Sequence, residues 1–289
     1  ARLAALGLLL IPTTGCHRAT AVAGTRFVDD AGDTVTVAAP VARVASLIPA
    51  TTELLFAIGA GEAVVGRTTW CDYPPAAARV TNLGDGINPT METILAVHPA
   101  LVLLYNSAQN ASAAERLRAL GIPTALLNTD RLEDVDRVSR LLGRITGHAR
   151  GADSVAAVFD SALAAAAPPP TVRRPKVLLL VWEQPPMTIG RSSFLSELVR
   201  RAGGENLFDD VTSTSGVVSV EAVARRDPDL ILTTTDGPAA FIHRPEWQVV
   251  RAVRERRLLQ VTGSEFNRPS PRAPMAVRAL ARRIRELTR

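Results

Sequence analysis

The stretch RVASLIPATTELLFAIGAGEAVVGRTTWCDYPP, residues 43–75, decides how the rest of the chain is interpreted. It begins with a short apolar run, residues 44–48, which a proline interrupts. We expect a helix next, capped by Thr51 or Thr52, because apolar residues follow at helical spacing and Gly59 then ends the run. This beginning is typical of a strand that leads through a turn into a helix.

A second apolar run, residues 63–66, follows the helix and ends in a polar and aromatic loop. That loop holds Trp70 and closes with Pro74 and Pro75, which exclude further regular pairing. Trp70 therefore has no helical or strand face to fill, and we expect it to be available to a ligand.

Apolar runs and helical segments alternate along the remainder of the chain. The expected strands after this opening unit are residues 100–105, 122–127 and 177–181. The expected helices include 111–120, 194–201 and the helical stretch 133–167, in which Gly143, Gly147 and Gly151 are candidate break points. We expect residues 182–190 to form a loop. Regular alternation of this kind predicts an α/β fold with parallel sheet covered by helices.

Two segments of the chain repeat each other. TMETILAVHPALVLL, residues 90–104, and SVEAVARRDPDLILT, residues 219–233, both carry a glutamate seven residues before a proline and then an apolar strand. Glu92 and Glu221 thus occupy equivalent places. The repeat predicts two Rossmann-like α/β lobes joined by a long α-helix, with a ligand cleft between the lobes.

Changes in composition and the positions of glycine and proline residues divide the chain into five predicted parts. These are a lipoprotein-type signal at 1–16, a tether and short hairpin at 17–42, an N-terminal α/β lobe at 43–147, a connecting helix and proline linker at 148–170, and a C-terminal α/β lobe at 171–289.

The first sixteen residues, ARLAALGLLLIPTTGC, combine an early positive charge, a short apolar run and small residues before Cys16. This run is too short to span a bilayer. It predicts lipidation of Cys16 and an anchored protein outside the cytoplasm, in the periplasm or at the cell surface; a plain secretory signal cut elsewhere is the alternative. If Cys16 carries lipid, Cys71 has no partner and no disulfide forms.

The net charge of +5 does not indicate nucleic-acid binding. The arginines are scattered over helices, and no basic element is interleaved with stacking aromatic residues. We expect a monomer that binds a small molecule and no nucleic acid.

The sequence PATTELLFAIG followed by VVGRTTWCDYPP resembles the cobalamin-binding periplasmic proteins of ABC importers. The resemblance extends from Arg43 to the C-terminal helix. This superfamily, the helical-backbone class of binding proteins, also holds siderophore and haem binders. The resemblance implies lobes that move little on binding and a function in capturing a corrinoid, vitamin B12, for a membrane permease. A ferric siderophore or haem is the alternative ligand.

The resemblance also implies ligand contacts. Trp70 matches the aromatic that touches the corrin, Tyr105 a second aromatic at the rim, Ala50 the helix start at the cleft, and Met187 an apolar contact. Trp182 begins the loop that holds Met187 and is a further candidate. Either aromatic at a strand end, Tyr105 or Trp182, could instead pack within its own lobe.

The segment SEFNRPSPR, residues 264–272, matches the ligand loop of that family. Ser264 stands where an acidic residue is expected and Glu265 where an aromatic is expected. The predicted ligand residues of this loop are Glu265, Phe266, Asn267 and Arg268.

In the same family, two glutamates dock onto arginines of the transmembrane subunits, and the resemblance gives this role to Glu92 and Glu221. The alternative is that each only stabilises a helix start through the macrodipole.

Other chemistries have less support. None of the four histidines follows a predicted strand, so we expect no metal site, and haem ligation by Tyr105 or His243 has no further support. No nucleophile with a positioned base can be identified at the strand ends. An envelope enzyme is therefore the less favoured alternative to a non-enzymatic binding protein without a covalent cofactor.

Overall fold

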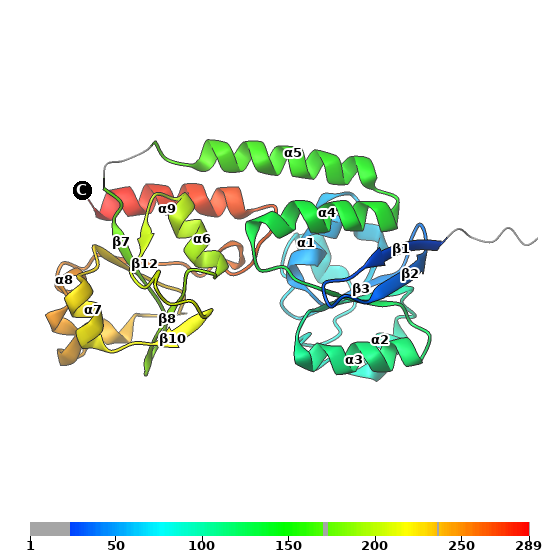
Figure 1. Ribbon diagram of the computed structural model, residues 1–289, viewed down its shortest axis with the longest axis horizontal. Coiled ribbons are helices and arrows are strands. Elements are labelled where there is room, and N and C mark those ends of the chain that lie inside the picture. Colours follow the sequence, from blue (N-terminus) through cyan, green and yellow to red (C-terminus); the bar gives the residue numbers. More distant parts are fainter. Residues whose placement is uncertain (1–23, 170–172, 236, 289) are drawn as a thin grey trace, which may run out of the picture.

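The computed structural model describes residues 24–169, 173–235 and 237–288. Two lobes, each built on a sheet, lie side by side, and helices cross the top of both (Figure 1). The predicted signal, Cys16 and the predicted tether up to residue 23 lie outside the described residues. The fold class is confirmed: two α/β lobes are joined by a long helix.

The first lobe is built on four parallel strands in the order β4-β3-β5-β6. Its central strands are buried on both faces, which is why they are short apolar runs. Its elements are the antiparallel hairpin β1 (Gly24–Val28) and β2 (Thr34–Ala38), strands β3 (Val44–Ser46), β4 (Val64–Arg67), β5 (Leu101–Tyr105) and β6 (Thr124–Leu127), and helices α1 (Pro49–Ala57), α2 (Met91–Ala96), α3 (Ala108–Ala119) and α4 (Leu132–Thr146).

The second lobe carries a mixed sheet with the order β10-β8-β7-β11-β12, and β9 also pairs with β7. Its elements are strands β7 (Lys176–Glu183), β8 (Pro186–Ile189), β9 (Glu205–Asn206), β10 (Ser215–Val217), β11 (Leu230–Thr233) and β12 (Leu258–Gln260), and helices α6 (Phe194–Arg201), α7 (Val220–Arg226), α8 (Arg251–Arg254) and α9 (Ala273–Leu287). Over the described ranges there are also five short 3-10 helices, at Gly61–Ala63, Pro75–Arg79, Ala240–His243, Pro245–Val249 and Ser264–Phe266.

Two local predictions are wrong. Helix α1 begins at Pro49 rather than after a threonine cap, because proline is pre-organised for the first helical position, and Thr51 and Thr52 are buried inside the helix. The segment predicted as the loop 182–190 is largely strand: β7 runs on to Glu183, and β8 returns antiparallel to it. Its two prolines lie in the turn and at the first strand position, where a missing N–H is tolerated.

The internal repeat is confirmed in the backbone. Glu92 and Glu221 both lie in the first turn of a short helix, α2 and α7, that precedes a buried parallel strand. His98 and Asp227, the residues before the two matching prolines, both adopt a left-handed conformation, with φ of 42° and 50°. The two lobes therefore share a helix, turn and strand unit down to an unusual backbone angle.

The connector α5 (Ala149–Ala166) packs against α4 and α9, and it runs above the first lobe as far as the near end of α9 in the second (Figure 1). The predicted helix 133–167 breaks once, at Gly147, where φ is 78°. The helix continues through Gly151, where glycine is required because a Cβ would lie 2.0 Å from the carbonyl oxygen of Ile58. Helix α5 is thus seated directly on the end of α1.

Candidate ligand-binding cleft

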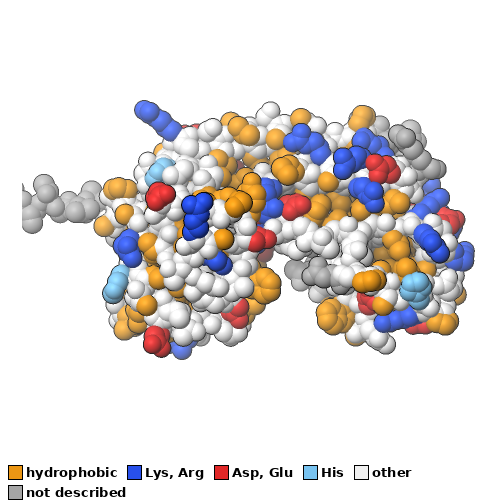
Figure 2. All heavy atoms as spheres, turned by 180° about the vertical axis from the view of Figure 1, so that it is seen from behind, with side chains coloured by type: hydrophobic (Ala, Val, Ile, Leu, Met, Phe, Trp, Pro, Cys, Tyr) orange, Lys and Arg blue, Asp and Glu red, His pale blue; other side chains and the backbone are white. Residues whose placement is uncertain are grey.

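A cavity of about 820 Å³ lies between the lobes, and Figure 2 shows the hollow there. Most of its lining comes from the carboxyl ends of the first lobe's parallel strands, the edge at which ligands bind in open parallel sheets. Residues 262–268 of the second lobe close the other side. The lining residues are Leu47, Ile48, Pro49, Ala50, Thr69, Trp70, Asp72, Asp85, Gly86, Ile87, Tyr105, Ser107, Gln109, Asn110, Thr129, Asp130, Thr262, Ser264, Asn267 and Arg268.

Trp70 presents its side chain to this cavity from a fixed loop. The indole is 61% exposed, whereas the next residue, Cys71, is buried with its sulfur 3.2 Å from the hydroxyls of Thr52 and Thr68. The Trp70 carbonyl accepts a hydrogen bond of 2.7 Å from Arg268 Nη1. A large flat side chain held in this way can stack on a ligand without first losing its own freedom.

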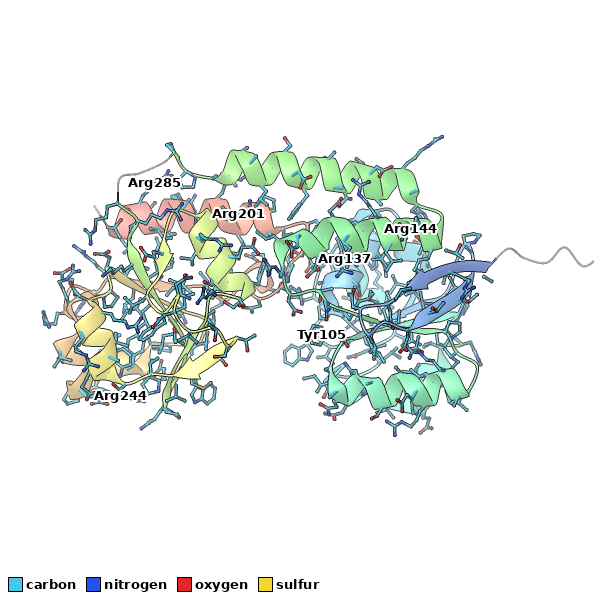
Figure 3. All side chains as sticks on the ribbon, viewed as in Figure 1. Tyr105, Arg137, Arg144, Arg201, Arg244 and Arg285 are labelled. Atoms are coloured by element: carbon cyan, nitrogen blue, oxygen red, sulfur yellow. The ribbon has the colours of Figure 1, made fainter. Side chains whose placement is uncertain are left out.

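Tyr105 ends strand β5 on the side of the first lobe that faces the second (Figure 3). Its hydroxyl donates to Asp130 Oδ1 at 2.7 Å. Burial and the neighbouring Asp130 carboxylate raise the pKa of Tyr105 to about 12, since both disfavour the phenolate. At neutral pH the hydroxyl is therefore protonated and already committed as a donor.

We expect the ultraviolet signal of tyrosinate to be nearly absent at pH 11 in a Tyr73→Phe background, where Tyr105 is the only tyrosine left. The folded pKa of about 12 lies above this pH, so most of the phenol stays protonated. Adding Asp130→Asn should increase the signal, because the carboxylate no longer opposes ionisation. An equal signal with and without Asp130→Asn would contradict this account.

Arg268 and Arg272 of the second lobe both form ion pairs with the buried carboxylate of Glu53, in α1 of the first lobe. Arg268 Nε lies 2.8 Å from Glu53 Oε1, and Arg272 Nε lies 2.8 Å from Glu53 Oε2. Arg268 also pairs with Asp72, and Arg272 with Glu265 at 2.9 Å. This ion-pair cluster links residues 264–272 of the second lobe to the first lobe.

Sequence reasoning missed Glu53. The available signal was a single acid inside the apolar run TTELLFAIG, on a helix whose neighbouring side chains are buried. A charge in such a place requires an opposite charge from elsewhere in the chain.

The structure brings five of the predicted ligand residues to the cavity and leaves four outside its lining. Ala50, Trp70, Tyr105, Asn267 and Arg268 line it.

The remaining four have other surroundings. Phe266 is 8% exposed and packs in the core, so its side chain is unavailable to a ligand, and the Glu265 carboxylate turns to Arg272. Trp182 and Met187 are paired across β7 and β8 in the second lobe.

The two glutamates of the repeat are both exposed. Because α2 and α7 each turn back into a parallel strand, their first turns lie toward the carboxyl edge of the sheets, where the cleft opens. Hydrogen bonds from its own backbone and from Ser219 hold the pKa of Glu221 below its usual range. Glu221 therefore stays ionised at neutral pH.

Within the described ranges, no three His, Cys, Asp or Glu side chains are grouped so as to hold a metal ion, and Cys71 is a free, buried thiol. Over the same ranges, no helix combines the length and apolar character needed to cross a membrane.

The periplasmic binding protein family matches residues 44–263, which cover the first lobe's side of the cleft and much of the second lobe. The chain belongs to this family. Membership implies a location outside the cytoplasm and a function in binding.

Several relatives of this binding protein have names or solved structures. It is 28% identical over 251 residues to a vitamin B12-binding protein of Pectobacterium atrosepticum, which covers 85% of this chain and 89% of the relative. The haem-binding protein RhuT of Roseiflexus has a similar structure, with a TM-score of 0.76, 24% identity and coverage of 86% and 99%. The vitamin B12-binding protein BtuF of Vibrio cholerae has a TM-score of 0.69, 23% identity and coverage of 86% and 99%.

Proposed function

We propose that this protein captures a corrinoid, vitamin B12 or a close analogue, in the cleft between its lobes and delivers it to the transmembrane subunits of an ABC importer. The observation that carries the proposal is the exposed, loop-fixed indole of Trp70 over a cavity of about 820 Å³. Such a cavity, apolar at Ile48, Ala50 and Ile87 and polar at its rim, suits a large flat ligand that carries amide groups.

The similarity to named vitamin B12-binding proteins supports the same ligand. In this proposal Trp70 stacks on the macrocycle, Tyr105 and Asn267 contact its edge, and Ala50 allows close approach to the start of α1. Trp182 and Met187, which lie outside the lining, have no assigned contact in this proposal. Lipidation of Cys16 would hold the protein at the membrane as a monomer beside its permease.

Isothermal titration of the chain from residue 20 onward with cyanocobalamin tests the proposal, with a ferric hydroxamate siderophore and haemin as parallel titrants. Tight one-to-one binding of cyanocobalamin is the expected result. Binding of the siderophore or haemin alone would retain the role and change the ligand. Absence of binding by all three would overturn the proposal and favour the enzyme alternative.

We expect the double variant Glu92→Lys and Glu221→Lys to bind cobalamin normally and to fail in uptake. Both carboxylates are exposed and outside the lining of the cavity, so their loss should affect docking to the permease and not ligand capture. Uptake of labelled cobalamin by cells in which the variant is the only binding protein gives the measurement.

A matched control for this double variant is Glu62→Lys with Glu205→Lys, because these two glutamates are also exposed, one in each lobe. They lie at the amino ends of β4 and β9, away from the cleft edge. The control should take up cobalamin normally. Loss of cobalamin binding in the Glu92 and Glu221 variant would instead assign these residues a structural role.

A further inference from the structure

The charge of the cleft is opposite to the charge of the whole protein. The chain carries a net charge of +5. The ionised side chains that line the cavity, among described residues, are three aspartates, Asp72, Asp85 and Asp130, and one arginine, Arg268. A ligand that enters this cleft thus meets an acidic surface in a basic protein.

Arg268, the arginine of the lining, is already paired with carboxylates of the protein and so offers little positive charge to a ligand. Arg268 pairs with Glu53 and with Asp72 and also donates to the Trp70 carbonyl, and its side chain is only 13% exposed. Arg272 lies behind it and is shared between Glu53 and Glu265. Two guanidinium groups therefore face three carboxylates, and the cluster as a whole is negative.

The other two aspartates have no cationic partner in the part of the chain that the structure describes. Asp130 accepts from the neutral Tyr105 hydroxyl. Asp85 accepts from the backbone N–H groups of Asn88 and Ile87, which hold its pKa below the usual range. Both carboxylates are exposed, so a ligand with an anionic group would meet their repulsion directly.

Among the described residues, the lining also lacks a free side chain of the kinds that usually ligate haem iron. It contains no histidine, methionine, cysteine or lysine, and the Tyr105 hydroxyl is occupied as a donor to Asp130. A haem that needs an axial histidine, methionine, cysteine or tyrosine from the protein would find none free there.

On the basis of the proposed function, we infer that this cleft selects its ligand by charge: it takes a neutral or cationic metal complex whose metal is already fully coordinated, and it rejects anionic complexes such as haem or a catecholate siderophore. Asp85 and Asp130 are the residues that set this preference. Steric fit and stacking on Trp70 decide affinity among the complexes that the charge admits.

The test compares ligands that differ in charge and little else. Cyanocobalamin is neutral, and its monocarboxylic acids replace one side-chain amide by a carboxylate. We expect the acids to bind about tenfold more weakly at low salt, and the gap to narrow as ionic strength rises. In the double variant Asp85→Asn and Asp130→Asn the ratio of the two affinities should fall toward one.

The control is Asp160→Asn on α5, an exposed aspartate outside the cavity lining, which should leave both affinities and their ratio unchanged. A wild-type ratio near one, or a ratio that persists in the Asp85 and Asp130 variant, would overturn the inference while leaving corrinoid capture intact.

A ferric series separates the two proposals if cyanocobalamin does not bind. Ferrioxamine B is a cation, whereas ferric enterobactin and haemin are anions. Binding of ferrioxamine B alone would retain charge selection and reject the corrinoid. Tighter binding of either anion, or binding of none of the neutral and cationic complexes, would overturn charge selection.

Discussion

Glu53→Ala is expected to lower the free energy of unfolding by about 3 kcal/mol, the largest effect on stability that we predict for a single substitution in this protein. The Glu53 side chain is 1% exposed, and it is the shared partner of Arg268 and Arg272, which are 13% and 11% exposed. Its removal leaves two poorly solvated guanidinium groups around an empty space. The remaining pairs with Asp72 and Glu265 keep the loss near the lower end of the range for broken buried pairs.

Urea unfolding followed by circular dichroism measures this change, and the melting temperature should fall by about 6 to 12 °C. Glu53→Gln keeps the shape and loses the charge, so we expect a smaller loss in the same direction. Glu115→Ala is the control, because Glu115 lies on the exposed face of α3 and should change stability little. Equal stability of the Glu53→Ala and Glu115→Ala proteins would show that the cluster does not hold the lobes together.

Trp70→Ala is expected to weaken cobalamin binding by about thirtyfold or more, because a buried aromatic anchor typically contributes about 2 kcal/mol or more to an interface. The indole is 61% exposed in the free protein, so its truncation removes contact with the ligand and little internal packing. Isothermal titration gives the affinity, and an unchanged melting temperature would show that the fold is intact.

Two further variants show whether the flat face of the ring matters. Trp70→Phe retains a smaller aromatic face and should lose only part of the affinity. Val158→Ala removes an equally accessible apolar group on α5, where Val158 is 65% exposed, and should have no effect. If Trp70→Phe bound as weakly as Trp70→Ala, stacking would not be the basis of the contact.

Much of the fold could be predicted from the sequence because its signals are local. Apolar runs of four to six residues alternate with helical segments, and the equal spacing from Glu92 to Pro99 and from Glu221 to Pro228 shows the repeat. Trp70 and Tyr105 could be placed at one edge because Trp70 follows one strand of the sheet and Tyr105 ends another. These inferences need only the chain direction and the side-chain period of each element.

The ion-pair cluster could not be predicted because it depends on contacts between distant parts of the chain. Glu53 and Arg268 are 215 residues apart and come together only when both lobes have formed. The β7–β8 hairpin was missed for a different reason. The prolines of EQPPM indicate a loop, whereas a two-residue turn places both where no ladder hydrogen bond is required.

The close seat of α5 on α1 at Gly151 has a kinetic consequence. With no room for even a methyl group between this helix and the Ile58 carbonyl, α5 is fixed on the first lobe when the chain folds, and it also packs against α9 of the second lobe, before any ligand arrives. Capture then requires little reorganisation, so the association rate should depend mainly on diffusion to an aperture that is already open. Differences in affinity between related ligands would then come mainly from their dissociation rates.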